Sequence, residues 1–240
     1  MRFTIVIILL LFKAGFICAQ PTMRPLTELI NAQDPGWPLV QTWIKESKNN
    51  VRVLPRTMAR ADSALLAAQV TTRSPMGALV YETGGILVDN GWLRILGSGS
   101  TALNRDLMGW NENKQAGMLL VADDVLGGFF ALNVGAFGQA SLGTIYYLAP
   151  DNLEWEPLDF GYSDFLIFCF SGNLAKFYDG MRWNGWQQEV AKLDGNQGIS
   201  CVPFLFTEEG KDISKVSRKP VPIAELWRLH NDFRKQLGIH

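Results

Sequence analysis

The chain has 240 residues, of which 48% are hydrophobic and 19% are charged, and its formal net charge at pH 7 is −1. This length and composition are typical of one large globular domain or two small ones. The near-neutral charge argues against a nucleic-acid partner and against electrostatic attachment to a membrane, because both interactions need a strongly basic surface.

The first 19 residues have the order of a secretory signal peptide. Arg2 supplies a positive charge, residues 3–12 are almost entirely apolar, and the segment ends in the small residue Ala19. The apolar run covers about ten residues, whereas a membrane-spanning helix needs about 20. We expect cleavage after Ala19 and export to the periplasm or the medium. No stable membrane span would remain in residues 20–240, which we expect to form a single domain. Lipidation of Cys18 and an uncleaved anchor are the alternatives.

The mature chain would contain few residues for metal or thiol chemistry. Its two cysteines are Cys169 and Cys201, both in apolar runs, and its two histidines are His230 and His240. These residues cannot form an ordinary structural zinc site with local ligand spacing. Two buried free thiols are favoured over a disulfide, although an oxidising compartment would permit one. We expect no metal, no cofactor and, on its apolar helical face, a packed rather than catalytic His230.

The amino-terminal third is predicted to be mainly helical. Residues 21–50 show helical spacing in two pieces separated by Pro35-Gly36, residues 51–54 form a short extended piece, and residues 57–70 form another helix. Ser74-Pro75 starts a further helix, because a serine side chain can cap free amides and proline suits the first turn. Gly84-Gly85 ends this helix.

From residue 86 onward the pattern becomes that of strands. Two apolar runs flank Asp89-Asn90-Gly91, which is a strong hairpin signal. The other expected elements are strands at 118–122, 129–133, 144–148 and 201–206, and helices at 162–178, 186–193 and 222–238. Residues 97–117 and 207–221 are expected to be loops. The predicted fold class is α+β, with a mainly antiparallel central sheet flanked by helices in a single domain.

Two resemblances refine this expectation. An acidic-glycine turn before an aromatic strand, Val121 to Phe130, followed by a helix that opens Ser163-Asp164-Phe165-Leu166, resembles the SUKH superfamily over residues 76–172. Many bacterial toxin-immunity proteins belong to that superfamily. Residues 24–228 resemble domain-of-unknown-function family 2625, through strings that include Thr72 to Gly77, Gly91 to Gly99 and Phe177 to Gly180. The resemblances imply a SUKH-like α+β fold and no activity, because fold does not fix function.

The first candidate site is aromatic and basic. Tryptophan, tyrosine and arginine concentrate where proteins bind partners. We therefore expect a flat or concave binding surface formed by Trp183, Trp186, Arg182, Trp92 and Arg94. The alternative is that the tryptophans fill the core, where each would bury a large area.

The second candidate site is acidic. Asp123 and Asp124 lie in a turn, and Glu154 and Glu156 lie close to a later strand. Two carboxylates can perform general acid–base chemistry when their environments separate their pKa values. The alternative is ordinary turn chemistry, in which the aspartates accept hydrogen bonds from backbone amides.

Three functional hypotheses follow from these patterns. The first is an exported, non-enzymatic binding or interaction domain, with a protein as a candidate ligand. The second is a carboxylate-based hydrolase of the cell envelope, which requires two carboxylates in one cleft. The third is a purely structural envelope domain.

Overall fold

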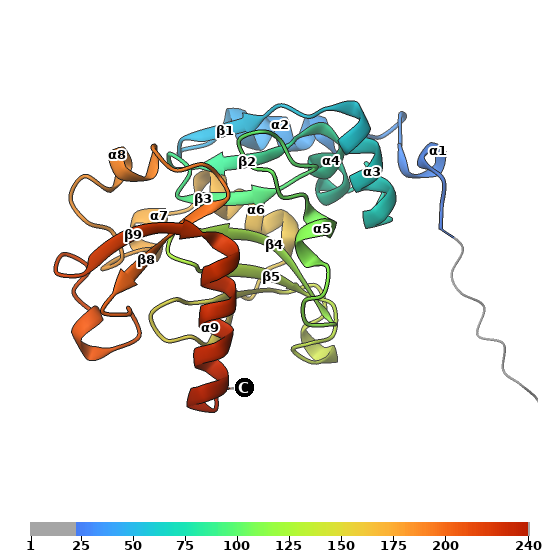
Figure 1. Ribbon diagram of the computed structural model, residues 1–240. Coiled ribbons are helices and arrows are strands. Elements are labelled where there is room, and N and C mark those ends of the chain that lie inside the picture. The colour runs from blue at the N-terminus through green and yellow to red at the C-terminus, as the bar shows by residue number, and fades with distance from the viewer. Residues whose placement is uncertain (1–22, 240) are drawn as a thin grey trace, which may run out of the picture.

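The computed structural model describes residues 23–239, so the predicted signal peptide lies outside the described residues (Figure 1). The centre of the fold is a sheet whose seven strands pair in sequence order, each antiparallel to the next. The prediction of an α+β fold with a mainly antiparallel central sheet is confirmed. The strands are β1 (Val51–Leu54), β2 (Gly85–Val88), β3 (Leu93–Leu96), β4 (Met118–Asp124), β5 (Phe129–Asn133), β6 (Ile145–Leu148) and β7 (Trp155–Pro157).

Helices from the amino-terminal third and the centre of the chain cover one face of this sheet. In this layer α4 contacts α2, α3 and α6, and buried side chains such as Leu79 and Phe165 pack with the inward residues of the strands. This face holds the largest cluster of buried hydrophobic residues. Burial of apolar surface stabilises the folded state by about 25 cal/mol per Å². The helices of this layer are α2 (Trp37–Lys45), α3 (Met58–Ala68), α4 (Pro75–Glu82) and α6 (Tyr162–Ser171), and the short α1 (Leu26–Leu29) packs on α3.

The carboxy-terminal quarter covers the second face. Strands β8 (Gln197–Val202) and β9 (Ser217–Pro222) form a separate two-stranded antiparallel ribbon, and α9 (Ile223–Leu237) follows directly. Figure 1 shows α9 crossing in front of β4 and β5. The ring of Trp227 packs edge-on against Phe129 of β5, with ring centroids 4.9 Å apart. The second face is therefore closed by the ribbon and by one long amphipathic helix.

The remaining elements are short. They are α5 (Leu107–Asn111), α7 (Leu174–Phe177), α8 (Trp186–Val190) and two 3-10 turns, η1 (Gln139–Ser141) and η2 (Glu208–Gly210). Within residues 23–239 no helix is both long enough and apolar enough to cross a membrane.

Local signals in the sequence explain several boundaries. The hydroxyl of Ser74 accepts a hydrogen bond from the amide of Gly77 at 3.1 Å, so the predicted cap at the start of α4 is confirmed. Between β2 and β3, Asp89 and Asn90 adopt φ values of 54° and 60°, and Gly91 follows at 88°. Two consecutive left-handed residues match the twist of a tight hairpin, as predicted.

Two predictions about secondary structure are wrong. The strand expected at residues 201–206 is instead β8, which ends at Val202, because Phe204 and Phe206 turn away to pack on Phe233 of α9. The expected loops 97–117 and 207–221 contain α5 and β9. Strand β9 carries two prolines and little apolar pattern, and its backbone pairs with β8 along its whole length.

Candidate functional site

The tryptophan cluster is buried rather than exposed. Trp92 has no exposed surface, and Trp183 and Trp186 are 5% and 9% exposed. Their rings pack on one another around Trp92, with centroids 5.8 Å and 5.1 Å apart. The prediction of an exposed tryptophan surface is therefore wrong. Burying three large aromatic rings together stabilises the core more than displaying them to solvent would.

Arg182 closes this cluster from outside. Its guanidinium lies 4.8 Å from the ring centre of Trp92 and 4.3 Å from that of Trp186, and it forms an ion pair with Asp89 at 2.6 Å. Asp89 belongs to the turn between β2 and β3. The arginine therefore couples the buried aromatic cluster to that turn through stacking and a charge-assisted contact.

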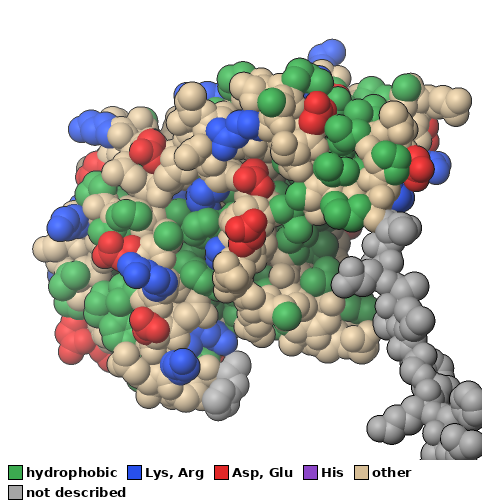
Figure 2. All heavy atoms as spheres, turned by 45° about the vertical axis from the view of Figure 1, so that its right-hand side comes forward, with side chains coloured by type: hydrophobic (Ala, Val, Ile, Leu, Met, Phe, Trp, Pro, Cys, Tyr) green, Lys and Arg blue, Asp and Glu red, His purple; other side chains and the backbone are tan. Residues whose placement is uncertain are grey.

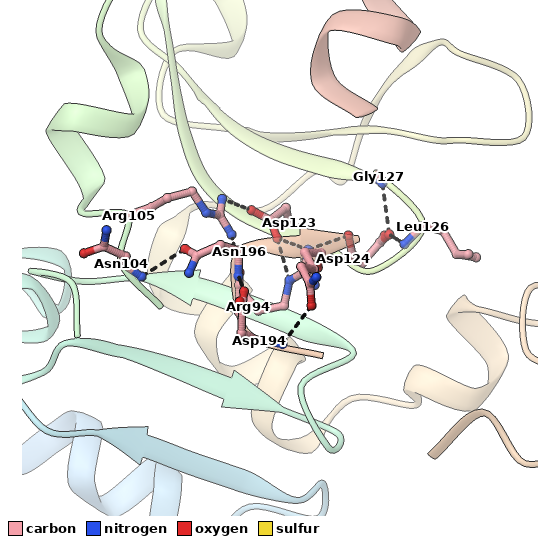
Figure 3. A network of polar contacts seen from close by, with 12 residues as sticks. Arg94, Asn104, Arg105, Asp123, Asp124, Leu126, Gly127, Asp194 and Asn196 are labelled. Carbon is pink, nitrogen blue, oxygen red and sulfur yellow. Dashed lines mark hydrogen bonds and ion pairs between the residues drawn. The ribbon is translucent and has the colours of Figure 1, made fainter. Parts of the chain in front are cut away.

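A buried network of charges lies beside the cluster (Figure 3). Arg94 on β3 pairs with Asp123 on β4, with its Nε 2.6 Å from Oδ1, and Arg105 contacts the other carboxylate oxygen. The side chain of Arg94 is 1% exposed and that of Asp123 is not exposed at all. Burial lowers the pKa of the Arg105 guanidinium, and the Asp123 carboxylate opposes this shift. A carboxylate shared by two guanidinium groups satisfies charges that would be costly to bury alone.

Both arginines also hold the loop that precedes β8. Arg94 donates to the carbonyl of Gln197 at 2.8 Å, and Arg105 donates to the carbonyl of Gly195 at 2.8 Å. The side-chain oxygen of Asn196 accepts the amide of Asn104 at 2.9 Å. Figure 3 shows Arg94 of β3, together with Asn104 and Arg105 of the segment before α5, beside the loop that carries Asp194 and Asn196. The network therefore fixes the backbone of residues 194–197.

Asp124 has a structural environment of its own. Its carboxylate accepts hydrogen bonds from the hydroxyl of Tyr147 at 2.7 Å and from the amides of Leu126 and Gly128, both at 2.9 Å. Complete burial raises the pKa of Asp124, and these hydrogen bonds oppose the rise. The bonds to the amides confirm the turn interpretation of this residue, which organises the tight connection between β4 and β5.

The four candidate acids do not form a shared catalytic cleft. Asp123 and Asp124 have no exposed surface, whereas Glu154 and Glu156 are exposed near β7. The two aspartates are engaged by arginines, a tyrosine and backbone amides, so neither can meet a solvent-borne substrate. The burial of Asp123 and Asp124 and the exposure of Glu154 and Glu156 therefore speak against the hypothesis of an acid–base pair and favour the turn interpretation. Among residues 23–239 no group of three or more His, Cys, Asp or Glu side chains could hold a metal ion.

Cys169 and Cys201 are both buried free thiols, so they do not form a disulfide. Burial raises the pKa of Cys169 well above its ordinary value and that of Cys201 to about 11. His230 is also buried, and its Nδ1 lies 3.0 Å from the carbonyl oxygen of Gly127. A carbonyl only accepts, so Nδ1 carries the proton. These three residues belong to the core.

A solvent-open cavity of about 200 Å³ lies over the edge of the sheet at β1 and β2. The strand register explains its position, because Arg52, Leu87 and Arg94 are direct cross-strand neighbours and share one face. Arg94 ends in the buried network, whereas Leu87 and Arg52 face the cavity. The opposite wall comes from α8 and the loop before β8. The lining residues are Asn50, Arg52, Leu87, Asn90, Gly91, Val190, Ala191, Leu193, Asp194 and Gly195.

Three of the residues predicted as a binding surface, Arg182, Trp186 and Arg94, support this cavity from behind together with Arg105, which the sequence did not indicate. Arg182 holds the turn that presents Asn90, and Trp186 begins the helix that presents Val190. Arg94 and Arg105 hold the loop that presents Asp194. The lining residues themselves were missed by sequence reasoning. They come from three separate segments, residues 50–52, 87–91 and 190–195, and no motif connects them.

The polar side chains of the cavity are free to meet a ligand. Within residues 23–239 no hydrogen bond or ion pair engages the side chain of Arg52, Asn50 or Asn90. The carboxylate of Asp194 accepts the amide of Asn196 at 2.7 Å and forms no ion pair with another described residue. One cation, one carboxylate and two amides therefore surround a small apolar floor, an arrangement that suits a small polar ligand.

The fold and the cavity together define a single-domain α+β protein with a small polar cavity at the edge of an antiparallel sheet. The chain belongs to the family described as protein of unknown function DUF2625, whose model matches residues 26–226. The predicted membership of this family is confirmed. The resemblance to the SUKH superfamily is not tested by this match and stays a prediction.

Two relatives are similar over almost their whole length. The uncharacterised protein YbfG of Escherichia coli is 43% identical over 218 residues, which covers 89% of this chain and 98% of YbfG. An uncharacterised protein of Haemophilus influenzae is 42% identical over 208 residues, covering 84% of this chain and 91% of the relative. Neither name assigns an activity.

Proposed function

We propose that this protein is an exported, non-enzymatic binding protein whose ligand occupies the cavity over β1 and β2. The observation that carries the proposal is the contrast between the polar side chains that line the cavity and the buried charged network behind it. Arg94, Arg105 and Asp123 pair with one another, whereas the side chains of Arg52, Asn50 and Asn90 line the cavity without a hydrogen bond or ion pair within residues 23–239, and Asp194 forms no ion pair there. Preorganised walls lower the entropic cost of holding a ligand.

The surface charge is consistent with this role. On the face shown in Figure 2, Lys and Arg side chains are interspersed with Asp and Glu rather than gathered into a basic stripe. The proposed ligand is accordingly bound by a local site and not by a general electrostatic field. A hydrolytic role for Asp123 and Asp124 gains no support from their complete burial.

Export rests on the charge, apolar core and small-residue end of residues 1–19. It is tested by fusing alkaline phosphatase after residue 40, either with or without residues 2–19. The proposal expects phosphatase activity only in the fusion that keeps the amino-terminal segment. Equal activity in both fusions would contradict export.

Binding is tested by thermal unfolding of the mature chain against a chemically diverse set of small metabolites. A ligand at one hundred times its Kd stabilises the folded state by about 2.7 kcal/mol. We expect Ala191→Phe, which fills the cavity, to abolish this stabilisation, and Ala224→Phe, at an exposed position of α9, to preserve it. The compound should be recovered unchanged. Stabilisation by no compound, stabilisation that survives Ala191→Phe, or conversion of the compound would contradict the proposal.

A further inference from the structure

The cavity presents opposite charges from two walls. Arg52 projects from β1, and Asp194 belongs to the loop held by the buried network. Neither side chain forms an ion pair within residues 23–239. An isolated anion would be repelled by the carboxylate and an isolated cation by the guanidinium, at the short separations of a small cavity. A ligand that carries both charges avoids both repulsions.

The floor of the cavity is aliphatic. Leu87, Val190 and Leu193 supply it, and none of the ten lining residues is aromatic. A planar or saccharide ring usually rests on an aromatic side chain, whereas a short branched alkyl group packs well on Leu and Val. The floor therefore favours a ligand with a small aliphatic portion.

The size of the cavity limits the ligand further. The volume is about 200 Å³. Sites for drug-sized ligands usually measure roughly 300–1,000 Å³, so this cavity suits a ligand as small as a single amino acid. Asn50 and Asn90 add amide donors and acceptors at the rim.

We propose that the cavity binds a free amino acid with a small aliphatic side chain. Its carboxylate pairs with Arg52, its ammonium group pairs with Asp194, and its side chain rests on Leu87, Val190 and Leu193. The bidentate geometry of a guanidinium suits a carboxylate, and the rigid loop places Asp194 opposite to it. This inference rests on the proposed binding function and specifies its ligand.

The test is calorimetric titration of the mature protein with alanine, valine and leucine, and with the N-acetyl and carboxamide derivatives of each. We expect saturable binding of at least one free amino acid. Acetylation or amidation should each weaken it at least tenfold, since each removes one charge that the cavity recognises. Binding that tolerates both modifications equally well would overturn the proposal.

Substitutions in the cavity and on the exposed face of α9 test whether the amino acid binds in the cavity. Arg52→Gln and Asp194→Asn should each weaken binding at least tenfold, and Asp194→Asn keeps an oxygen to accept the amide of Asn196. The matched controls Arg228→Gln and Asp232→Asn, at exposed positions of α9, should leave it unchanged. Far-ultraviolet circular dichroism and the melting temperature of each unliganded variant report whether folding is retained.

The outcomes also distinguish this inference from the proposed function. Binding of a saccharide or a peptide that Ala191→Phe abolishes would overturn the amino-acid assignment and leave the binding function standing. The absence of binding by all amino acids tested, with folded protein at millimolar ligand, would overturn the assignment as well. Amino-acid binding that is unaffected by both Arg52→Gln and Asp194→Asn would place the ligand elsewhere and refute the site.

Discussion

Replacing Asp123 by asparagine should destabilise the fold more than any surface substitution. The change preserves the shape of the side chain and removes its charge. Arg94, whose side chain is 1% exposed, and Arg105, whose side chain is 10% exposed, would then remain buried without a counter-charge. Removing one partner of a buried ion pair typically costs about 3–5 kcal/mol. The free energy of unfolding of a domain is about 5–15 kcal/mol, so the loss should be a large fraction of the total.

The assay is guanidinium-chloride unfolding of residues 20–240, followed by the fluorescence of the buried tryptophans. The matched control is Asp34→Asn, because Asp34 pairs with Arg73 at 3.0 Å while both side chains are about 70% exposed. An exposed pair contributes less than about 1 kcal/mol. If Asp123→Asn costs no more than Asp34→Asn, the network does not stabilise the fold in the way described.

Three further predictions concern the core. Gly128→Ala should lower the free energy of unfolding by about 2 kcal/mol, because a Cβ at this position would collide with the carboxylate of Asp124. The assay is unfolding in urea, and a midpoint concentration equal to that of the original protein would contradict this close contact. Burial lowers the pKa of His230 from 6.5 to about 4. At a pH between these two values the histidine binds a proton in the unfolded chain but not in the folded chain. The free energy of unfolding should therefore fall by up to about 3 kcal/mol as the pH falls from 6.5 to about 4. His230→Gln should remove this pH dependence. Iodoacetamide should label Cys169 and Cys201 only after denaturant is added, because burial keeps both thiols protonated and covered, and fast labelling of the native protein would refute this.

The sequence predicts the sheet well wherever local signals and tertiary packing agree. The hairpin at Asp89-Asn90-Gly91 and the helix start at Ser74 depend on backbone chemistry that neighbouring residues determine, and both are confirmed. At residues 201–206 the apolar residues reflect packing of two phenylalanines on α9, which no local pattern distinguishes from a strand. Strand β9 depends on its partner β8, so its own composition is uninformative.

The candidate site shows the same division. The residue types of Trp92, Arg94 and Arg182 indicated a binding site, and these residues do lie behind the cavity, where Trp92 and Arg94 are buried and the side chain of Arg182 is 15% exposed. Residue type alone cannot distinguish a tryptophan that contacts a ligand from one that holds the wall behind it. Arg52 and Asp194 are separated by more than a hundred residues and meet only through the strand register and the loop.

Native mass spectrometry of the protein recovered from separated periplasmic, medium and cytoplasmic fractions tests the central claim most directly. The account predicts a chain shortened by cleavage after Ala19, found outside the cytoplasm, with a small non-covalent adduct that Arg52→Gln loses. A full-length chain confined to the cytoplasm, or an exported chain whose adduct persists in Arg52→Gln, would contradict it.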